Sequence, residues 1–190
     1  MHTEYECTLL DVDKNEFIKK LEENNAIKIG DFFQKRYTYD FNPKDPNKWI
    51  RLRTNGKTST LTIKNLVGEE IIGGMRELEI EVSDFELTNL FLKELGYNYR
   101  NYQENKRTTY ILDDVEIDID SWPLIPDYVE IEGKNEQEVK KIIEKLKLDN
   151  NKIVKSDVVN IYNNYYNIDI LSIKELRFDY ESMLEHNKQM

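Results

Sequence analysis

The sequence predicts an α+β fold in which seven or eight antiparallel strands carry three amphipathic helices on their outside. Short segments rich in β-branched and aromatic residues alternate charged with aliphatic side chains, which is typical of strands. Three helical patterns interrupt these segments, and each one opens on a capping residue. Acidic strands and basic strands also follow one another as separate rows, whereas an ordinary outer surface would mix the two signs on each strand.

The strand patterns occur at eight places along the chain. The predicted strands cover residues 3–10, 27–41, 49–53, 58–64, 77–82, 97–112, 115–121 and 128–132. Between the third and fourth of them, Asn55-Gly56 is a residue pair typical of a tight hairpin. The first strand carries Glu4 and Glu6 on one face, because side chains two positions apart on a strand point the same way.

The three predicted helices are indicated by the residues at their ends. Asp13 begins the first one with the spacing of a capping box. Ser83 or Asp84 caps the second, which Gly96 closes, and Asn135 caps the third. Each helix carries an apolar stripe, so each is expected to cover part of the strand layer.

The composition excludes several classes of protein. The formal charge of −10 and the pI near 4.9 argue against non-specific binding to nucleic acid or to an anionic membrane. One cysteine and two histidines give neither an internal disulfide nor a cysteine and histidine zinc pattern. The first residues show no signal-peptide pattern, and we expect a cytoplasmic protein.

The 190 residues are expected to form one main domain with an appendage. We place the main domain at residues 1–150. Residues 151–190 are predicted to be a helical segment that packs on the strand domain or caps it. The protein is expected to be a monomer or a homodimer.

The two faces of the strands allow two arrangements. In an ordinary antiparallel sheet, the aliphatic residues face the core and the charges face water. In the inverted arrangement, the sheet closes into a small barrel with its charges inside, and helices cover its aliphatic outer face. We favour the barrel because acids and bases are sorted strand by strand. The neighbours Lys106 and Arg107 must point to opposite faces, so only one of them enters the lumen.

A lumen that holds both signs of charge suits one kind of ligand. Arginine and lysine side chains bind the oxygens of a triphosphate. Carboxylates would repel a triphosphate unless they hold a divalent cation, and oxygen ligands without histidine or thiolate indicate Mg²⁺ or Mn²⁺. The sequence therefore predicts a site for a metal and a polyphosphate, while Trp49 and Trp122 are expected to be packing residues.

Seven short patterns follow one another within residues 3–148. They are Glu4-x-Glu6, Arg51-x-Arg53, the strand 60–64, Glu79-x-Glu81, Lys106-Arg107, Asp118-x-Asp120-x-Trp122-Pro123 and Glu130-x-Glu132-Gly133. In this order they resemble the CYTH family of triphosphate tunnel metalloenzymes, which includes class IV adenylate cyclases, thiamine triphosphatases and inorganic triphosphatases. The resemblance implies an eight-stranded antiparallel tunnel.

The resemblance also implies roles for individual residues. The metal ligands would be Glu4, Glu6, Glu130 and Glu132, with Asp118 or Asp120. The phosphate-binding residues would be Arg51, Arg53, Lys64 and either Arg107 or Lys106, to which we add Lys35. The residues assigned to catalysis are Glu4, Glu6, Lys64, Glu79 and Glu81, of which the last two would orient a base or a metal-bound water.

The chain departs from the family pattern at one position. The family pattern is Glu-x-Glu-x-Lys, and Thr8 stands where the lysine would be. A hydroxyl hydrogen-bonds a phosphate oxygen or a water but carries no positive charge at neutral pH. We therefore consider Lys35 as a base that compensates for the missing lysine.

These residues predict a metal-dependent phosphohydrolase that acts on a small triphosphate, such as inorganic triphosphate, a nucleoside triphosphate or thiamine triphosphate. The first alternative is a class IV adenylate cyclase, in which the same lumen would align the ribose 3′-hydroxyl of ATP with the α-phosphorus. The second is a non-catalytic binder of nucleotides or polyphosphate, which the threonine at position 8 suggests. The sequence shows no adenine pocket that would separate the first two.

Overall fold

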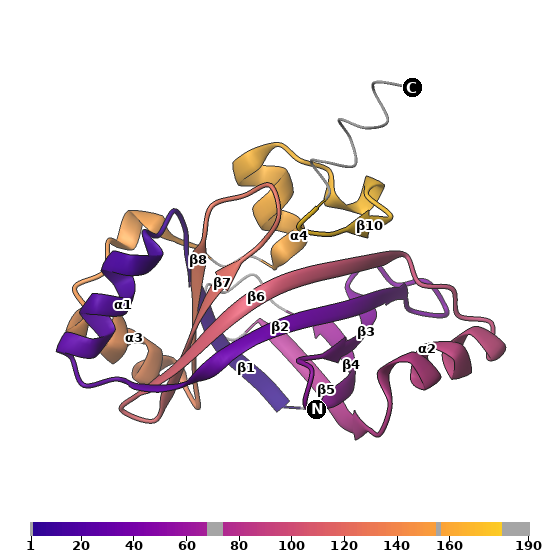
Figure 1. The fold of residues 1–190 in the computed structure, drawn as a ribbon, viewed down its shortest axis with the longest axis horizontal. Helices are drawn as coiled ribbons and strands as arrows, with labels where there is room; N and C mark the ends of the chain where they lie inside the picture. The colour runs from indigo at the N-terminus through magenta and orange to yellow at the C-terminus, as the bar shows by residue number, and fades with distance from the viewer. Residues whose placement is uncertain (1, 68–73, 155–156, 180–190) are drawn as a thin grey trace.

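The computed structural model describes residues 2–67, 74–154 and 157–179, and its strands close into an antiparallel barrel (Figure 1). The eight barrel strands are β1 (His2–Leu9), β2 (Ile27–Asp40), β3 (Lys48–Thr54), β4 (Ser59–Leu66), β5 (Met75–Val82), β6 (Asn101–Leu112), β7 (Val115–Ser121) and β8 (Tyr128–Gly133). They are hydrogen-bonded in the order β6-β2-β3-β4-β5-β1-β8-β7, and β7 pairs back with β6. The predicted α+β barrel is therefore confirmed.

Three ten-residue helices lie outside the barrel, as predicted. They are α1 (Lys14–Glu23), α2 (Phe85–Glu94) and α3 (Glu136–Lys145). Asp13 accepts hydrogen bonds from the amides of the first turn of α1, while Asp84 and Asn135 each accept one at the start of α2 and α3. Side-chain oxygens satisfy amides that have no partner within a helix, so these three residues fix where the helices begin.

The apolar core lies between the barrel wall and the helices. On one side α1 and α3 pack on the outward aliphatic residues of β1, β7 and β8, with Phe17, Ile117, Ile131 and Val139 among the buried members. On the other side α2 covers β2 and β3 through a smaller cluster. Burial of aliphatic area, about 25 cal/mol per Å², therefore stabilises the outside of the barrel and leaves the inside to polar groups.

The strand register shows which side chains face the lumen, because residues directly opposite each other across two strands share a face. Glu6 lies opposite Glu132 on β8, and Lys64 lies opposite Glu77 on β5. Arg107 on β6 lies opposite Asp120 on β7. The charged residues thus line the inside of the barrel, as the inverted arrangement predicts.

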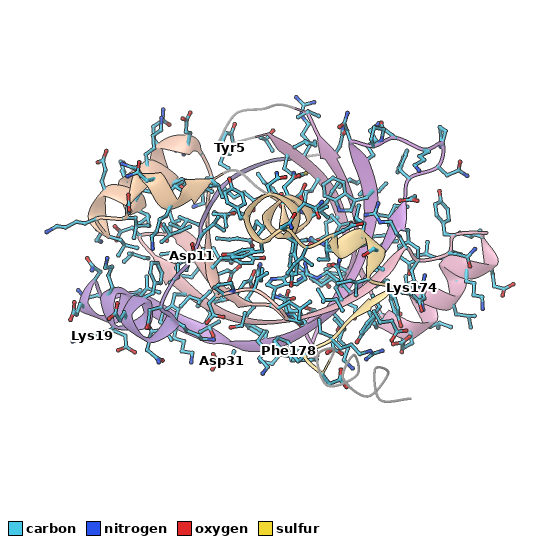
Figure 2. All side chains as sticks on the ribbon, turned by 90° about the horizontal axis from the view of Figure 1, so that it is seen from above. Tyr5, Asp11, Lys19, Asp31, Lys174 and Phe178 are labelled. Carbon is cyan, nitrogen blue, oxygen red and sulfur yellow. The ribbon has the colours of Figure 1, made fainter. Side chains whose placement is uncertain are left out.

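Residues 157–179 form short helical turns over one end of the barrel, and Figure 2 shows them above its centre. These elements are α4 (Val158–Asn160), η2 (Ile161–Tyr165), η3 (Ile170–Ser172) and the short strand β10 (Glu175–Leu176), which pairs in parallel with β6. A second two-residue strand, β9 (Ile153–Val154), pairs with β1 after the 3₁₀ turn η1 (Asn150–Lys152).

Buried side chains attach this segment to the barrel. The Tyr162 hydroxyl donates to the carbonyl of Pro123, and Asn101 Nδ2 donates to the carbonyl of Ile173 over 2.6 Å. Residues 155–156 and 180–190 of the predicted C-terminal segment lie outside the described residues. None of the described helices combines the length and the apolar character that crossing a membrane requires.

Candidate active site

One wall of the lumen is acidic and is built from β1 and β8. The alternation of β1 turns Glu4 and Glu6 inward, and the register sets Glu6 opposite Glu132 and Thr8 opposite Glu130. Four of the predicted metal ligands therefore lie on two neighbouring strands, with Thr8 buried between them.

These carboxyl groups raise one another's pKa. Burial, followed by the charge of Glu130, raises the pKa of Glu6 to about 8. Burial and the charges of Glu4 and Glu116 raise the pKa of Glu132 to about 7. A carboxylate in this wall is therefore costly without a cation beside it.

Lys64 on β4 connects this wall to the basic residues. Its Nζ lies 3.4 Å from Glu4 Oε2 and pairs more closely with Glu77. Glu77 Oε2 also lies 3.7 Å from Arg51 Nη2. Burial and repulsion by Arg51 lower the pKa of Lys64. The charges of Glu4 and Glu6 act in the opposite direction but are weaker, so the pKa is lowered overall.

Glu79 lies on the basic side of the lumen rather than with the β1 glutamates. It accepts a hydrogen bond from the Thr62 hydroxyl at 2.6 Å and lies 3.5 Å from Arg51 Nη2. Burial alone would raise the pKa of Glu79, but these neighbours and Arg53 lower it. Glu81, two residues further along β5, is exposed. Glu79 is thus an anion that orients Arg51.

Arg107 on β6 is surrounded by acids. Its guanidinium contacts Asp118 at 2.6 Å and both Asp120 and Glu130 at 2.5 Å. Burial lowers the pKa of Arg107, but the charges of Asp120, Asp118 and Glu130 outweigh burial and raise it. The structure therefore pairs Asp118 and Asp120 with Arg107, and Asp118 also lies opposite Glu130, one of the predicted metal ligands.

Arg36 and Arg53 face each other from β2 and β3. Repulsion by Arg51, together with burial, lowers the pKa of Arg53 to about 9, and burial followed by the charges of Arg51 and Arg53 does the same for Arg36. Arg36 was not among the residues assigned from the sequence. The sequence predicts its neighbour Lys35 instead, because two-residue alternation alone does not tell which of two adjacent bases faces inward.

Two predicted phosphate-binding residues lie on the outer face. Lys35 is exposed opposite Thr54. Lys106 is exposed, and its Nζ lies 4.5 Å from the centroid of the Phe178 ring. Both side chains point outward because their neighbours Arg36 and Arg107 occupy the inward positions. Neither lysine joins the lumen group, and the assignment to Lys35 and Lys106 is corrected accordingly.

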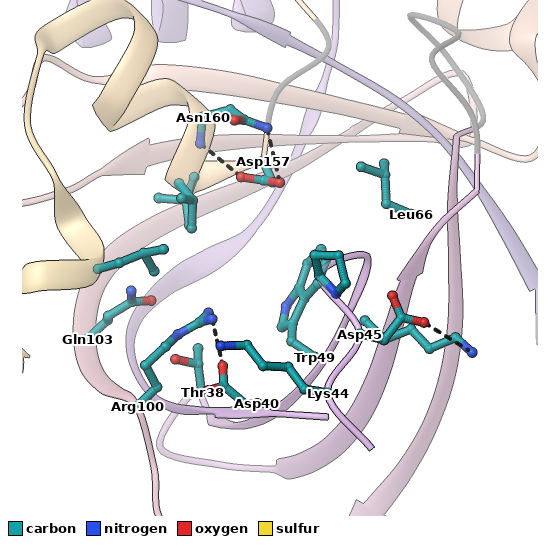
Figure 3. A pocket seen from close by; sticks show the side chains of 15 residues that line it. Thr38, Asp40, Lys44, Asp45, Trp49, Leu66, Arg100, Gln103, Asp157 and Asn160 are labelled. Carbon is teal, nitrogen blue, oxygen red and sulfur yellow. Dashed lines mark hydrogen bonds and ion pairs between the residues drawn. The ribbon is translucent and has the colours of Figure 1, made fainter. Parts of the chain in front are cut away.

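Two neighbouring cavities lie between the walls and the C-terminal segment. A cavity of about 80 Å³ is bordered by acids and bases from both walls, among them Glu6, Arg36, Arg51, Lys64, Arg107 and Glu130. A cavity of about 490 Å³ adjoins it and shares Thr38, Trp49 and Gln103 (Figure 3). Trp49 borders both cavities, while Trp122 borders the smaller one and packs against Tyr162 and Arg36.

The CYTH domain family model matches residues 2–167 of the chain. The chain belongs to the CYTH family. No curated protein matches this CYTH chain. Its similarity to solved structures lies in the fold, since sequence identity is low in each of the following cases.

Three solved structures illustrate the similarity of the CYTH barrel to known folds. The PH1012 protein of Pyrococcus horikoshii has a TM-score of 0.70 and 24% identity, covering 81% of this chain and 96% of that one. A putative adenylate cyclase from Vibrio parahaemolyticus has a TM-score of 0.72 and 12% identity, with coverages of 85% and 98%. A putative adenylyl cyclase from Hippeastrum, described as having a dominant triphosphatase activity, has a TM-score of 0.60 and 13% identity, with coverages of 91% and 100%.

Members of the CYTH family depend on a metal. The acidic wall fits a hard divalent cation in its chemistry, since Glu4, Glu6, Glu130 and Glu132 offer only carboxylate oxygens. Among the described residues, however, no three carboxylates, histidines or cysteines are arranged to hold a metal ion as they stand. Glu4 is turned towards Lys64 and Glu130 towards Arg107. The donor set is therefore present while two of its members pair with bases.

Proposed function

We propose that this CYTH protein is a divalent-metal-dependent phosphohydrolase that acts on a small molecule carrying a triphosphate. The observation that supports the proposal is the opposition of two walls in one lumen. The acids of one wall have raised pKa values and the arginines of the other have lowered ones. A metal triphosphate complex brings a cation to the acidic wall and anionic oxygens to the basic wall. It therefore reduces the repulsion between like charges in both walls.

The bases of the lumen are proposed to bind the phosphate oxygens. Arg51 and Arg53 lie side by side on one face of β3, with Lys64 on the neighbouring strand. Arginine forks and the lysine ammonium would hold the oxygens and orient the chain of phosphates. Arg107 has strong protein partners already, so its proposed contribution is a single donor turned towards the substrate while its carboxylates keep it in place.

Glu4, Glu6, Glu130 and Glu132 are proposed to hold Mg²⁺ or Mn²⁺. When bound, such a cation neutralises charge on the phosphates and makes its bound water more acidic. Water would attack the terminal phosphorus in line with the leaving oxygen, so that one P–O bond forms as another breaks. Glu79 and Glu81 would orient a base or this water, and Glu79 would do so from its contacts with Arg51 and Thr62.

An adenylate cyclase activity is the second candidate, because the larger cavity leaves room for an organic group beside the triphosphate. A volume of about 490 Å³ lies in the range of cavities that hold small organic ligands. This cavity adjoins the charged one, so an organic group attached to a bound triphosphate would find room in it. Both nucleotides and other organic triphosphates fit this description.

The test is product analysis after incubation with ATP, tripolyphosphate or thiamine triphosphate, each with Mg²⁺, with Mn²⁺ and with chelator. Metal-dependent release of orthophosphate supports the hydrolase, and its rate on each compound ranks the substrates. Formation of cyclic AMP and pyrophosphate from ATP identifies a cyclase instead. Absence of all products, with triphosphate still raising the melting temperature, contradicts catalysis and leaves a binding protein.

A further inference from the structure

Arg36 differs from the other lumen bases in what surrounds its charge. It lies on β2 between Arg53 of β3 and Gln103 of β6, which face it across the two ladders. It is only 6% exposed. Among the residues that the structure describes, no ion pair includes Arg36, whereas Arg107 has three. Arg36 is therefore a buried cation next to other cations.

The contacts of Arg36 orient its guanidinium without neutralising it. Nη2 donates to Gln34 Oε1 at 2.9 Å and to Asn105 Oδ1, and both acceptors are uncharged amides. The guanidinium also lies 4.5 Å from the centroid of the Trp122 ring. Removing a charge from water without a counterion is costly. This arrangement stabilises one geometry of the side chain and leaves its charge for something else.

Unsatisfied hydrogen-bond donors gather around the same position. Arg36 Nε, Thr38 Oγ1, Arg51 Nε and Trp122 Nε1 are buried and have no hydrogen-bond partner. All four side chains border the cavity of about 80 Å³. Buried donors are nearly always satisfied in folded proteins, so a group rich in acceptor oxygens is expected among them. Together with the charge of Arg36, these donors specify an anion.

We propose that Arg36, supported by Thr38 and Trp122, is a phosphate-binding residue of this protein and holds one phosphoryl group of the substrate on the β2 side of the lumen. This inference rests on the proposed function, because it assigns a further contact to the same substrate. Thr38 also borders the cavity of about 490 Å³. The phosphoryl group at Arg36 is accordingly close to the space proposed for the organic part.

The inference makes two linked predictions for Arg36→Gln. Loss of a charge-assisted contact should weaken tripolyphosphate binding by about tenfold to a hundredfold. The melting temperature without ligand should stay the same or rise, because the variant removes a buried charge that Arg51, Arg53 and Arg107 repel. A residue that only packs on Trp122 would give the opposite result, with a lower melting temperature and unchanged affinity.

The experiment measures tripolyphosphate binding by calorimetry, once with Mg²⁺ and once with chelator, together with the melting temperature with and without tripolyphosphate. Arg76→Gln is the matched control, since Arg76 is an exposed arginine on the outer face of β5 and its replacement changes the net charge equally. Arg36→Lys serves as a second variant that keeps the charge and loses the fork. It should bind more weakly than the unmodified protein and more tightly than Arg36→Gln.

The outcomes separate this inference from the proposed function. If the unmodified protein binds no triphosphate with or without metal, the proposed function is wrong and the inference falls with it. If the unmodified protein binds tripolyphosphate and both Arg36 variants bind as tightly as Arg76→Gln, only the role of Arg36 is wrong. Should Arg36→Gln fail to fold, Arg36→Lys with unchanged affinity and a lowered melting temperature would also overturn it.

Discussion

The acidic wall of β1 and β8 and the basic wall of β2 and β3 each bury charges of one sign close together. The charges are negative in the first wall and positive in the second. The pKa of Glu6 is raised to about 8 and that of Glu132 to about 7, because burial and like charges oppose the ionisation of both carboxyl groups. Arg36 and Arg53 have pKa values lowered to about 9 because burial and like charges oppose protonation. Each wall therefore lacks the charge that a metal triphosphate complex would bring to it.

Arg107 is a base of the lumen whose charge is neutralised by neighbouring carboxylates. Three carboxylates contact it, and its pKa is raised rather than lowered. The difference from Arg36 separates two uses of arginine. Arg107 joins β6, β7 and β8 into one wall, whereas no ion pair of the described residues includes Arg36.

The largest loss of stability is expected when the ion pairs of Arg107 are broken. Arg107→Gln leaves the buried Asp118 and Asp120 and the half-buried Glu130 without their cation and should lower the free energy of unfolding by about 3–5 kcal/mol. Urea denaturation followed by circular dichroism measures it. Arg76→Gln, on the outer face, should change the stability by less than about 0.5 kcal/mol. Equal stability of the two variants would mean that the Arg107 cluster contributes no more than a surface charge.

Neutralising the acidic wall should affect turnover and spare stability. Glu6→Gln removes a proposed metal ligand, and we expect metal-dependent hydrolysis to fall by at least about a hundredfold. The unliganded protein should not lose stability, because the charge of Glu6 is repelled by Glu130. Steady-state kinetics at several Mn²⁺ concentrations, together with a melting curve in chelator, measures both. Activity that is unchanged at low metal would exclude Glu6 as a ligand.

The raised pKa values of the acidic wall predict how stability depends on pH without metal. A carboxyl whose pKa is raised on folding stabilises the native state at low pH, and this contribution is lost as the unfolded chain ionises first. For Glu6 the loss should extend from about pH 4.5 to about pH 8, and for Glu132 to about pH 7. The melting temperature in chelator should fall across this range. Glu6→Gln should flatten the fall, and a curve of unchanged slope would contradict the assignment.

The smallest effect is expected at Thr8, which faces Glu130 within the acidic wall. Thr8→Lys places a cation between carboxylates that repel one another, so it should lower the pKa of Glu6. We expect a gain of about tenfold in tripolyphosphate affinity, from one added charge-assisted contact. Calorimetry at pH 7 measures it, with Thr8→Met as a control of similar length. Weaker binding by Thr8→Lys than by Thr8→Met would show that this wall does not accept a base.

Local patterns in the sequence are enough to predict the strands, the helices and the rows of glutamates that face inward. Alternation on β1, β5 and β8 placed the glutamates on one face of each strand, and the capping residues Asp13, Asp84 and Asn135 marked the helices. These features depend on neighbours within a few residues, so they are visible in a single chain. The order of the seven short patterns also indicates the barrel.

Only the folded barrel shows which base of each adjacent pair faces the lumen and which carboxylate it contacts. Arg36 rather than Lys35 faces inward, and Asp118 and Asp120 form ion pairs with Arg107. Alternation has a period of two, so a shift of one residue in register exchanges the faces of a whole strand. That register is fixed only when all eight strands close, because it depends on partners as far apart in the chain as Tyr5 and Gly133.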